Sequence, residues 1–312
     1  MTADLYLGLD IGGTKIELAA CDAALAVVQR QRIATPTADF DDFVAQVTTL
    51  VNRAEAGLGQ SATAVGIGLP GIVDAVSGCQ LSSNVPALNG QRVGPALAAA
   101  LGRPVHIGND CQCFALSEAQ GGAADGLPSM FGAILGTGAG GGFCVGGRLV
   151  TGYNSLAGEW GHWPVPAALL MRHDLPLLPC PCGLRGCLER YVSGTGLATL
   201  YQLRATSPQP AADAAAVHAL AAQGDEAAVE ALAIHLDLLA QGLAGLVLAL
   251  DPHAIVLGGG LSKLQRLYDE LPAAMARHLF SGAHVPPLLP PRFGDAGGAR
   301  GAALLARQQS GG

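Results

Sequence analysis

Residues 159–189 constrain the fold of this chain more than any other segment. They contain His162 and, after a spacer, three cysteines within eight residues, Cys180, Cys182 and Cys187. One histidine and three cysteines complete a tetrahedral zinc site with no position left for water, so the pattern predicts a structural metal. The alternative is a disulfide or a group of buried thiols. A Cys180–Cys182 bridge would be strained in so short a loop and would leave His162 without a role.

A pattern of strand, glycine turn and strand occurs twice, in residues 5–22 and 130–150. The sequence after Lys15 in the first segment suits a strand, whereas a Walker phosphate loop requires a helix there. The second turn, 136–142, matches the dinucleotide fingerprint G-x-G-x-x-G, but no helix follows it, so we exclude an NAD site. Both segments are predicted to be β-hairpins whose turns offer backbone N–H groups to phosphate. Their recurrence indicates two related α/β lobes that present glycine turns to one polyphosphate.

Two aspartates stand at the ends of predicted strands. Asp10 either faces a Mg²⁺ ion carried by a nucleotide or is a buried aspartate in an ordinary hairpin, and the residues alone leave both readings open. Asp110 lies where strand 105–108 passes into helix 111–120. It is either the N-cap of that helix or a general base that the positive end of the helix keeps ionised. Adjacent residues can divide these two roles.

Further loops are candidate ligand contacts. Pro70-Gly71 breaks strand 65–69 at its C-terminal end, where ligands collect in open α/β sheets. Asn84 lies in a polar loop and is either a sugar contact or a turn residue. The triplet Gly258–Gly260 allows a flat group such as adenine or ribose to approach the backbone. The remaining predicted elements are helices 41–56, 192–205, 211–222, 226–249, 263–279 and 294–309, strand 254–257 and an extended connector, 286–291.

Charge and hydropathy exclude several classes of protein. The net charge of -7 argues against a nucleic-acid binder, which would carry a basic face. The best candidate for a membrane span, 229–250, contains charged residues, and its longest apolar run, 242–250, is too short to cross a bilayer. The first residues lack the pattern of a signal peptide. We therefore expect a soluble cytoplasmic protein without a membrane partner. The cysteines outside the cluster are expected to be reduced core residues: Cys21, Cys79, Cys111, Cys113 and Cys144.

Taken together, these motifs resemble the ROK family of sugar kinases and repressors, and they span nearly the whole chain. The matching segments are Asp10–Lys15, Gly68–Gly71, Asn109-Asp110, Gly136–Gly142, Glu159–His162, Cys180–Glu189 and Gly258–Gly260. Within the family, the local sequence is most similar to the bacterial kinases of N-acetylglucosamine. The segments that carry this finer resemblance are Asn84–Pro86, Asn109–Glu118 and Gly294–Gly298.

The resemblance implies an α/β protein with the two-lobed, actin-like ATPase (ribonuclease H-like) fold and a structural zinc site. ATP and sugar are expected in the cleft, and the last helix is expected to return to the first lobe. The implied lobes are residues 1–118 plus 298–312, with the phosphate hairpin and the catalytic aspartate, and residues 119–297, with the second hairpin, the zinc site and the adenosine loop. The family also implies a homodimer.

The function implied by the resemblance is ATP-dependent phosphorylation of N-acetyl-D-glucosamine at its 6-hydroxyl, giving N-acetylglucosamine 6-phosphate and ADP, with Mg²⁺ accompanying ATP. Asp110 is the implied catalytic base, and His162 is expected to bind zinc with one ring nitrogen and sugar with the other. The implied sugar contacts are Gly71, Asn84, Asn109, Asp110, Glu159, His162 and Glu189. The implied nucleotide contacts are Gly8, Asp10, Gly12, Gly13, Thr14, Lys15, Gly136, Thr137, Gly138, Gly140, Gly141, Gly142, Gly258, Gly259 and Gly260.

Two kinds of alternative remain open. A glucokinase, a fructokinase or an N-acetylmannosamine kinase of the same family would share most of these motifs. A regulator that senses sugar without turnover is the other alternative. The presence of Asp110 and of both phosphate hairpins argues against it, as does the start of the first hairpin within ten residues of Met1, which leaves no room for a DNA-binding segment.

Overall fold

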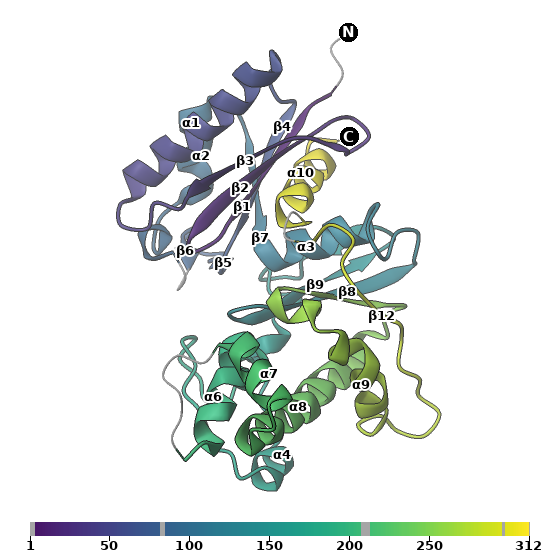
Figure 1. Ribbon diagram of the computed structural model, residues 1–312. Helices are drawn as coiled ribbons and strands as arrows, with labels where there is room; N and C mark the ends of the chain where they lie inside the picture. Colours follow the sequence, from purple (N-terminus) through teal and green to yellow (C-terminus); the bar gives the residue numbers. More distant parts are fainter. Residues whose placement is uncertain (1–3, 82–84, 207–212, 295–296, 312) are drawn as a thin grey trace. The chain divides into compact units, whose positions relative to one another are not determined.

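The computed structural model describes residues 4–81, 85–206, 213–294 and 297–311 (Figure 1). The chain divides into two compact units. The first unit comprises Met1–Gly126, Gly142–Ala157 and Arg292–Gly312, and the second comprises Leu127–Gly141 and Gly158–Pro291. The lobes expected from the sequence differ from these units mainly at residues 142–157, and the lobe boundaries stay a prediction.

The first unit is built on a mixed sheet of five strands in the order β3-β2-β1-β4-β7, counted over the described residues. The strands are β1 (Tyr6–Ile11), β2 (Lys15–Cys21), β3 (Val27–Ala34), β4 (Ala64–Leu69) and β7 (Val105–Asn109). Strands β1 and β2 pair antiparallel, so the first predicted hairpin is confirmed. Strands β1, β4 and β7 run parallel to one another. The polar edge strand β3 was not predicted, because its side chains alternate only between exposed and half-buried positions.

Helices cover both faces of this sheet: α1 (Phe40–Leu58) and α2 (Val93–Leu101) lie on one side, and α3 (Asp110–Ala119) and α10 (Gly297–Gln309) on the other (Figure 1). Successive residues of β1 point to opposite faces of the sheet, so they face different helices. Leu7 and Leu9 enter the same apolar core as Phe43 of α1, whereas Gly8 faces α10. The small elements of this unit are β5 (Ile72–Val73), β6 (Gln80–Leu81) and the 3₁₀ turn η1 (Pro86–Leu88).

Glycines bring α10 unusually close to the sheet and to α3. A Cβ atom on Gly8 would collide with the carbonyl oxygen of Ala299, and one on Gly66 of β4 would collide with that of Ala302. A Cβ atom on Gly301 would collide with the carbonyl oxygen of Cys113 in α3. These glycines therefore serve helix packing, a long-range reason that sequence reasoning did not identify.

We expect Gly301→Ala to destabilise the first unit, although alanine is the better helix former. The clash is with backbone, so the helix must move, and such overpacking costs about 1–3 kcal/mol. Gly57→Ala in α1 is the matched control. Its nearest neighbour is the movable end of Gln29, so this variant should gain up to about 1 kcal/mol from helix propensity. Urea unfolding of both variants checks the prediction, and equal stabilities would contradict it.

The second sheet has the order β10-β9-β8-β11-β12 within the described residues. Its strands are β8 (Ser129–Leu135), β9 (Ala139–Val145), β10 (Arg148–Val150), β11 (Ile255–Gly258) and β12 (Leu288–Leu289). Strands β8 and β9 form the second predicted hairpin, but β9 begins at Ala139, so the turn is shorter than the predicted segment 136–142. Strand β12 pairs with β11 inside segment 286–291, which was expected to be an extended connector. The contacts group residues 142–157, which include β10, with the first unit.

The second unit is otherwise helical. Its elements are the 3₁₀ turns η2 (Trp160–His162) and η3 (Gly260–Lys263) and the helices α4 (Ala167–Arg172), α5 (Glu189–Val192), α6 (Gly194–Arg204), α7 (Ala214–Ala222), α8 (Glu226–Leu250) and α9 (Gln265–Ala276). By length and composition α8 is able to span a membrane, but 67% of its apolar window is buried in the protein. Its Asp237 is paired within the protein, because it accepts hydrogen bonds from His173 and His278, each at 2.8 Å. These are properties of a core helix.

Candidate functional site

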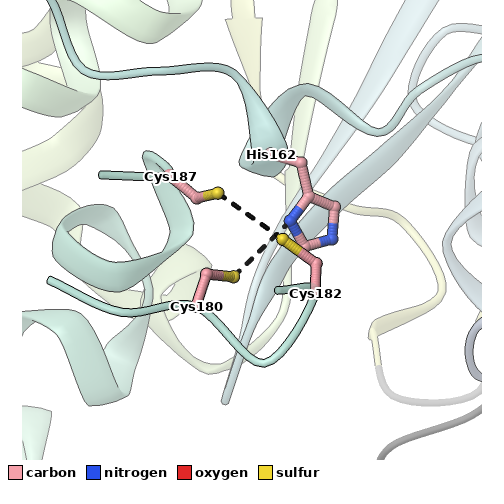
Figure 2. A group of neighbouring side chains, drawn as sticks. All are labelled: His162, Cys180, Cys182 and Cys187. Atoms are coloured by element: carbon pink, nitrogen blue, oxygen red, sulfur yellow. Dashed lines mark hydrogen bonds between the residues drawn. The ribbon is translucent and has the colours of Figure 1, made fainter. Parts of the chain in front are cut away.

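Four side chains converge in the second unit to form the cluster predicted from the sequence. The ligand atoms of His162, Cys180, Cys182 and Cys187 all lie within 4.8 Å of one another (Figure 2). The Sγ of Cys180 lies 3.7 Å from Nδ1 of His162, and the Sγ atoms of Cys182 and Cys187 are also 3.7 Å apart. Glycines with positive φ, Gly183 at 90° and Gly186 at 75°, let the loop fold around the cluster.

These distances fit a tetrahedral metal ion. Zinc binds thiolate at about 2.3 Å, which places two sulfurs of a regular tetrahedron about 3.8 Å apart. A disulfide requires sulfurs at about 2.05 Å, so the 3.7 Å separation of Cys182 and Cys187 excludes one. Within the described part of the chain all eight cysteines are free. The cluster is therefore compatible with a structural metal, as the sequence predicted.

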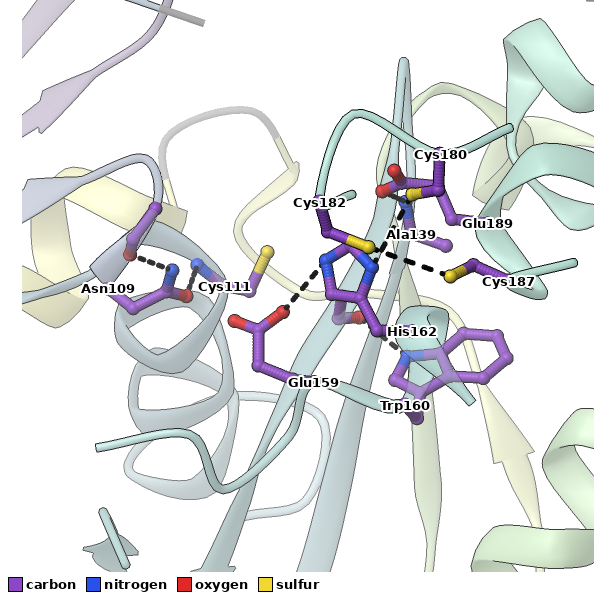
Figure 3. Close-up of polar contacts among 12 residues, drawn as sticks. Asn109, Cys111, Ala139, Glu159, Trp160, His162, Cys180, Cys182, Cys187 and Glu189 are labelled. Carbon is purple, nitrogen blue, oxygen red and sulfur yellow. Dashed lines mark hydrogen bonds and ion pairs between the residues drawn. The ribbon is translucent and has the colours of Figure 1, made fainter. Parts of the chain in front are cut away.

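Two other predicted site residues, Glu159 and Glu189, lie beside the cluster. Oε2 of Glu159 approaches Nε2 of His162 at 3.7 Å, leaving Nδ1 of the ring on the cluster side. Glu189, two residues after Cys187, accepts a hydrogen bond at 2.9 Å from the backbone N–H of Ala139 (Figure 3). The metal cluster and the second glycine turn are therefore connected within one unit.

The second glycine turn and the Gly258–Gly260 triplet meet at one cavity of about 700 Å³. Gly136, Thr137 and Gly260 all line it, and Gly259 lies against the backbone of Leu135 with φ 77°. Gly140 and Gly141 lie in β9, as does Gly142, which is grouped with the first unit. The remaining cavity residues, which sequence reasoning missed, are mostly on α6, α7 and η3: Gly194, Thr195, Ala198, Thr199, Gln202, Asp213, Ala214, Ala215, Leu261 and Leu264. Their spacing is that of ordinary helices and carries no local motif.

In the first unit, the capping role that was considered for Asp110 belongs to its neighbour Asn109. The N-cap of α3 is Asn109, whose Oδ1 accepts hydrogen bonds from the N–H groups of Cys111 and Gln112 (Figure 3). Its Nδ2 donates to the carbonyl oxygen of Gly71 at 2.9 Å. Asp110 is the first residue of the helix and needs no capping role. Its Oδ1 accepts a hydrogen bond from the N–H of Cys111 at 2.9 Å.

The first glycine turn is held by backbone and hydroxyl contacts. The N–H of Gly12 donates to the carbonyl oxygen of Lys15, and Oγ1 of Thr35 donates to the carbonyl oxygen of Gly12. Gly13 lies in the same turn, and the carbonyl oxygen of Thr14 accepts from the N–H of Thr35. The ammonium group of Lys15 pairs with Glu17 at 3.9 Å.

Two carboxyl groups of the first unit have raised pKa values. Burial raises the pKa of Asp10 to about 7, and the negative charges of Asp110 and Glu17 add to the effect. Burial also raises the pKa of Asp110, against hydrogen bonds from Cys111 that lower it. Clustered carboxyls of this kind are frequent at functional sites, where a cation or a substrate compensates the charge.

We expect the pH dependence of stability to report on Asp10. The pKa of Asp10 is about 7 in the folded chain, above its ordinary value of 3.8. Between pH 3.8 and pH 7 the folded state therefore holds a proton on Asp10 that the unfolded state has lost. The free energy of unfolding then falls as the pH rises through this range. The amide of an Asp10→Asn variant does not ionise. Without nucleotide or divalent cation, the Tm of this variant should therefore rise relative to the native protein from about pH 5 to pH 8. A difference in Tm that is independent of pH would contradict the assignment.

The expectation that all five cysteines outside the cluster are core residues needs a correction. Cys21, Cys113 and Cys144 are buried as expected, but Cys79 and Cys111 are only half-buried and are not core residues, because they lie in a surface turn and in the first turn of α3. Asn84, a predicted sugar contact, lies outside the described residues.

Comparison with known proteins places these observations in a family. The chain is 49% identical over 96% of its length to an N-acetylgalactosamine kinase of Shewanella sp., of which it covers 96%. It is 43% identical over 96% of its length to an N-acetyl-D-glucosamine kinase of Photobacterium profundum, of which it covers 99%. The crystal structure of a ROK hexokinase from Thermus thermophilus superposes with a TM-score of 0.87 at 32% identity, covering 98% of each chain.

The resemblance inferred from the motifs is confirmed by these matches, and the fold is the two-domain α/β fold of ROK sugar kinases. The model of the ROK family matches residues 6–309, which is nearly the whole chain. The protein belongs to the ROK family.

Proposed function

We propose that this protein transfers the γ-phosphoryl group of ATP to the 6-hydroxyl of N-acetyl-D-glucosamine, producing N-acetylglucosamine 6-phosphate and ADP. One observation carries the proposal: the second unit contains both the metal cluster with Glu159, His162 and Glu189 and a glycine turn hydrogen-bonded to Glu189. The side chains of Glu159, His162 and Glu189 suit the hydroxyl groups of a sugar, and the glycine turn suits phosphate. The similarity to N-acetyl-D-glucosamine kinases supports the choice of sugar.

The cavity of the second unit is the proposed nucleotide site. Its leucine and alanine side chains suit a purine face, and Thr195, Thr199 and Gln202 supply polar groups for its edge. The glycine turns suit phosphate because their backbone N–H groups have no side chain in front of them. We propose Gly136, Thr137, Gly138, Gly140, Gly141, Gly142, Gly258, Gly259 and Gly260 as nucleotide contacts, with Asp10, Gly12, Gly13, Thr14 and Lys15 of the first unit. Gly8, which was expected to be a further contact, packs against α10 instead.

Asp110 is the proposed general base. In phosphoryl transfer the transition state is loose, so the enzyme acts mainly by positioning and by stabilising charge. A buried carboxylate whose pKa is raised accepts a proton from a hydroxyl more readily than an ordinary one. The proposed sugar contacts are Gly71, Asn84 and Asn109 with Asp110 in the first unit, and Glu159, His162 and Glu189 in the second.

Two metal ions fit the residues that are present. The Cys₃His set suits zinc, which would fix the tautomer and the orientation of the His162 ring when bound. His162 then directs Nε2 away from the cluster, toward Glu159 and the proposed sugar. Asp10 suits the Mg²⁺ ion that accompanies ATP, because a cation would compensate its buried charge. We further propose that the protein is a homodimer, as its family resemblance implies, and that it is cytoplasmic, as the sequence pattern of its first residues and of α8 suggests.

A second substrate is favoured by one observation: the relative at 49% identity is an N-acetylgalactosamine kinase. N-acetylgalactosamine differs from N-acetylglucosamine only in the orientation of the 4-hydroxyl. A site that hydrogen-bonds the acetamido and 6-hydroxyl groups can therefore accept both sugars, and discrimination depends on the contacts of one hydroxyl.

A coupled assay of ADP formation with five sugars tests the proposal: N-acetylglucosamine, N-acetylgalactosamine, N-acetylmannosamine, glucose and fructose. We expect the highest kcat/KM with N-acetylglucosamine, a lower value with its 4-epimer and the smallest values with sugars that lack the acetamido group. A higher kcat/KM with N-acetylgalactosamine would favour the second candidate. No ADP formation with any sugar would refute the kinase and favour a sugar-sensing regulator.

A further inference from the structure

The segment that follows the metal cluster forms hydrogen bonds with most residues of the turn between β8 and β9. The carbonyl oxygens of Gly136 and Thr137 accept hydrogen bonds at 2.8 Å from the N–H of Gly194 and from Oγ1 of Thr195. The N–H of Ala139 donates to Oε2 of Glu189 at 2.9 Å. Within the turn, the N–H of Gly136 donates to the carbonyl oxygen of Gly138 at 2.9 Å.

The segment that precedes the cluster holds the same turn from its other end. Trp160, which is 1% exposed, donates from Nε1 to the carbonyl oxygen of Gly140 at 2.8 Å. A Cβ atom on Gly161 would collide with the carbonyl oxygen of Ala139, so the backbone before His162 lies directly against the turn. Glu189 also contacts the turn closely, because a Cβ atom on Gly138 would lie 2.5 Å from its Oε2.

These contacts come from residues that the cluster ligands fix in place. Trp160 is two residues before His162, and Glu189 is two residues after Cys187. The two segments are also joined to each other, because the N–H of Leu188 donates to the carbonyl oxygen of Trp163 at 2.9 Å. The cluster therefore fixes both attachment points of the turn.

We propose that Glu189 and Trp160 are positioning residues for the nucleotide, through which the metal cluster sets the shape of the phosphate turn. Glu189 cannot serve only as a sugar contact, because one of its oxygens already holds the N–H of Ala139. That N–H is in turn not available to phosphate. The carboxylate orders the turn so that the neighbouring glycine N–H groups point correctly. This inference rests on the proposed function, since it assumes that the turn binds the phosphates of ATP.

Calorimetric titration with Mg²⁺ and ADP in the absence of sugar separates this role from sugar binding. Glu189→Ala removes the acceptor, and Trp160→Phe removes the indole N–H while keeping an aromatic ring. Each variant should raise the Kd for the nucleotide by roughly 2–10-fold, the effect of one lost hydrogen bond. Glu189→Gln keeps an oxygen that accepts from Ala139, so its Kd should stay within about twofold of native, although its KM for sugar rises.

Trp163→Phe is the matched control, because Trp163 is 37% exposed and lies against Gly245 of α8. It should leave the Kd for the nucleotide unchanged. Circular dichroism confirms that each variant is folded. Native affinity for the nucleotide in both Glu189→Ala and Trp160→Phe would overturn the inference, as would a Glu189→Gln variant as weak as Glu189→Ala. Absence of nucleotide binding by the unmodified protein would refute the proposed function itself and the inference with it.

Discussion

Replacing Asp110 with asparagine is expected to lower kcat by about 10²–10⁴-fold, the usual contribution of a positioned general base. Asparagine has the same shape and keeps an oxygen that accepts the Cys111 N–H, which Oδ1 of Asp110 accepts at 2.9 Å. Helix α3 should remain intact, because Asn109 caps it. The KM for sugar should therefore change little, since the variant loses a proton acceptor and keeps its hydrogen bonds.

Steady-state kinetics and thermal melting of this variant measure the effect. Asp39→Asn is the matched control, because Asp39 caps α1 in the same unit and asparagine caps equally well. It should keep both activity and Tm. An Asp110→Asn protein with near-native kcat would remove Asp110 from the catalytic role, whereas loss of folding would indicate that the buried carboxyl is structural.

Replacing Cys182 with serine is expected to remove the bound metal and to change three properties together. The metal content should fall from about one zinc per chain to a small fraction, because a hydroxyl is a poor replacement for a thiolate ligand. The Tm should fall, since metal binding contributes directly to folding free energy. The KM for sugar should rise because His162 loses its fixed orientation, and the Kd for the nucleotide should rise because the segments around the cluster hold the phosphate turn.

Metal analysis of protein purified without added zinc, followed by melting and kinetics, checks this expectation. Cys79→Ser is the control, because Cys79 is a half-buried cysteine outside the cluster. It should retain metal, Tm and activity. A native protein that is metal-free and fully active would rule out the structural role of the ion.

The parts of the site that were predictable from the sequence are those whose chemistry is local. The cluster was predictable because three ligands stand within eight residues. The two glycine turns were recognisable because a turn and its flanking strands are contiguous. The same locality explains why Asn109 and Asp110 could be placed at a strand end but not assigned between capping and catalysis, which depends on side-chain direction.

The parts that were not predictable depend on contacts between distant segments. Gly8 was expected to contact nucleotide and Gly66 was not singled out, yet both accommodate α10, a helix more than two hundred residues away in the sequence. The cavity wall formed by Thr195 and Gln202 has no signature, because helix residues acquire that role only through packing. Strand β12 is too short for a period of two to be visible.

The position of α10 has a consequence for the biosynthesis of the protein. The strands β1, β4 and β7 leave the ribosome early, but the helix that covers one face of their sheet consists of residues 297–309, which are translated much later. The second unit is complete in sequence before that helix is made. The second unit can therefore fold while one face of the sheet in the first unit is still uncovered. An exposed apolar surface of this kind is prone to aggregation, so this is the period when a nascent chain most needs a chaperone. Closure of this face of the sheet must therefore wait until residues 297–309 have been synthesised.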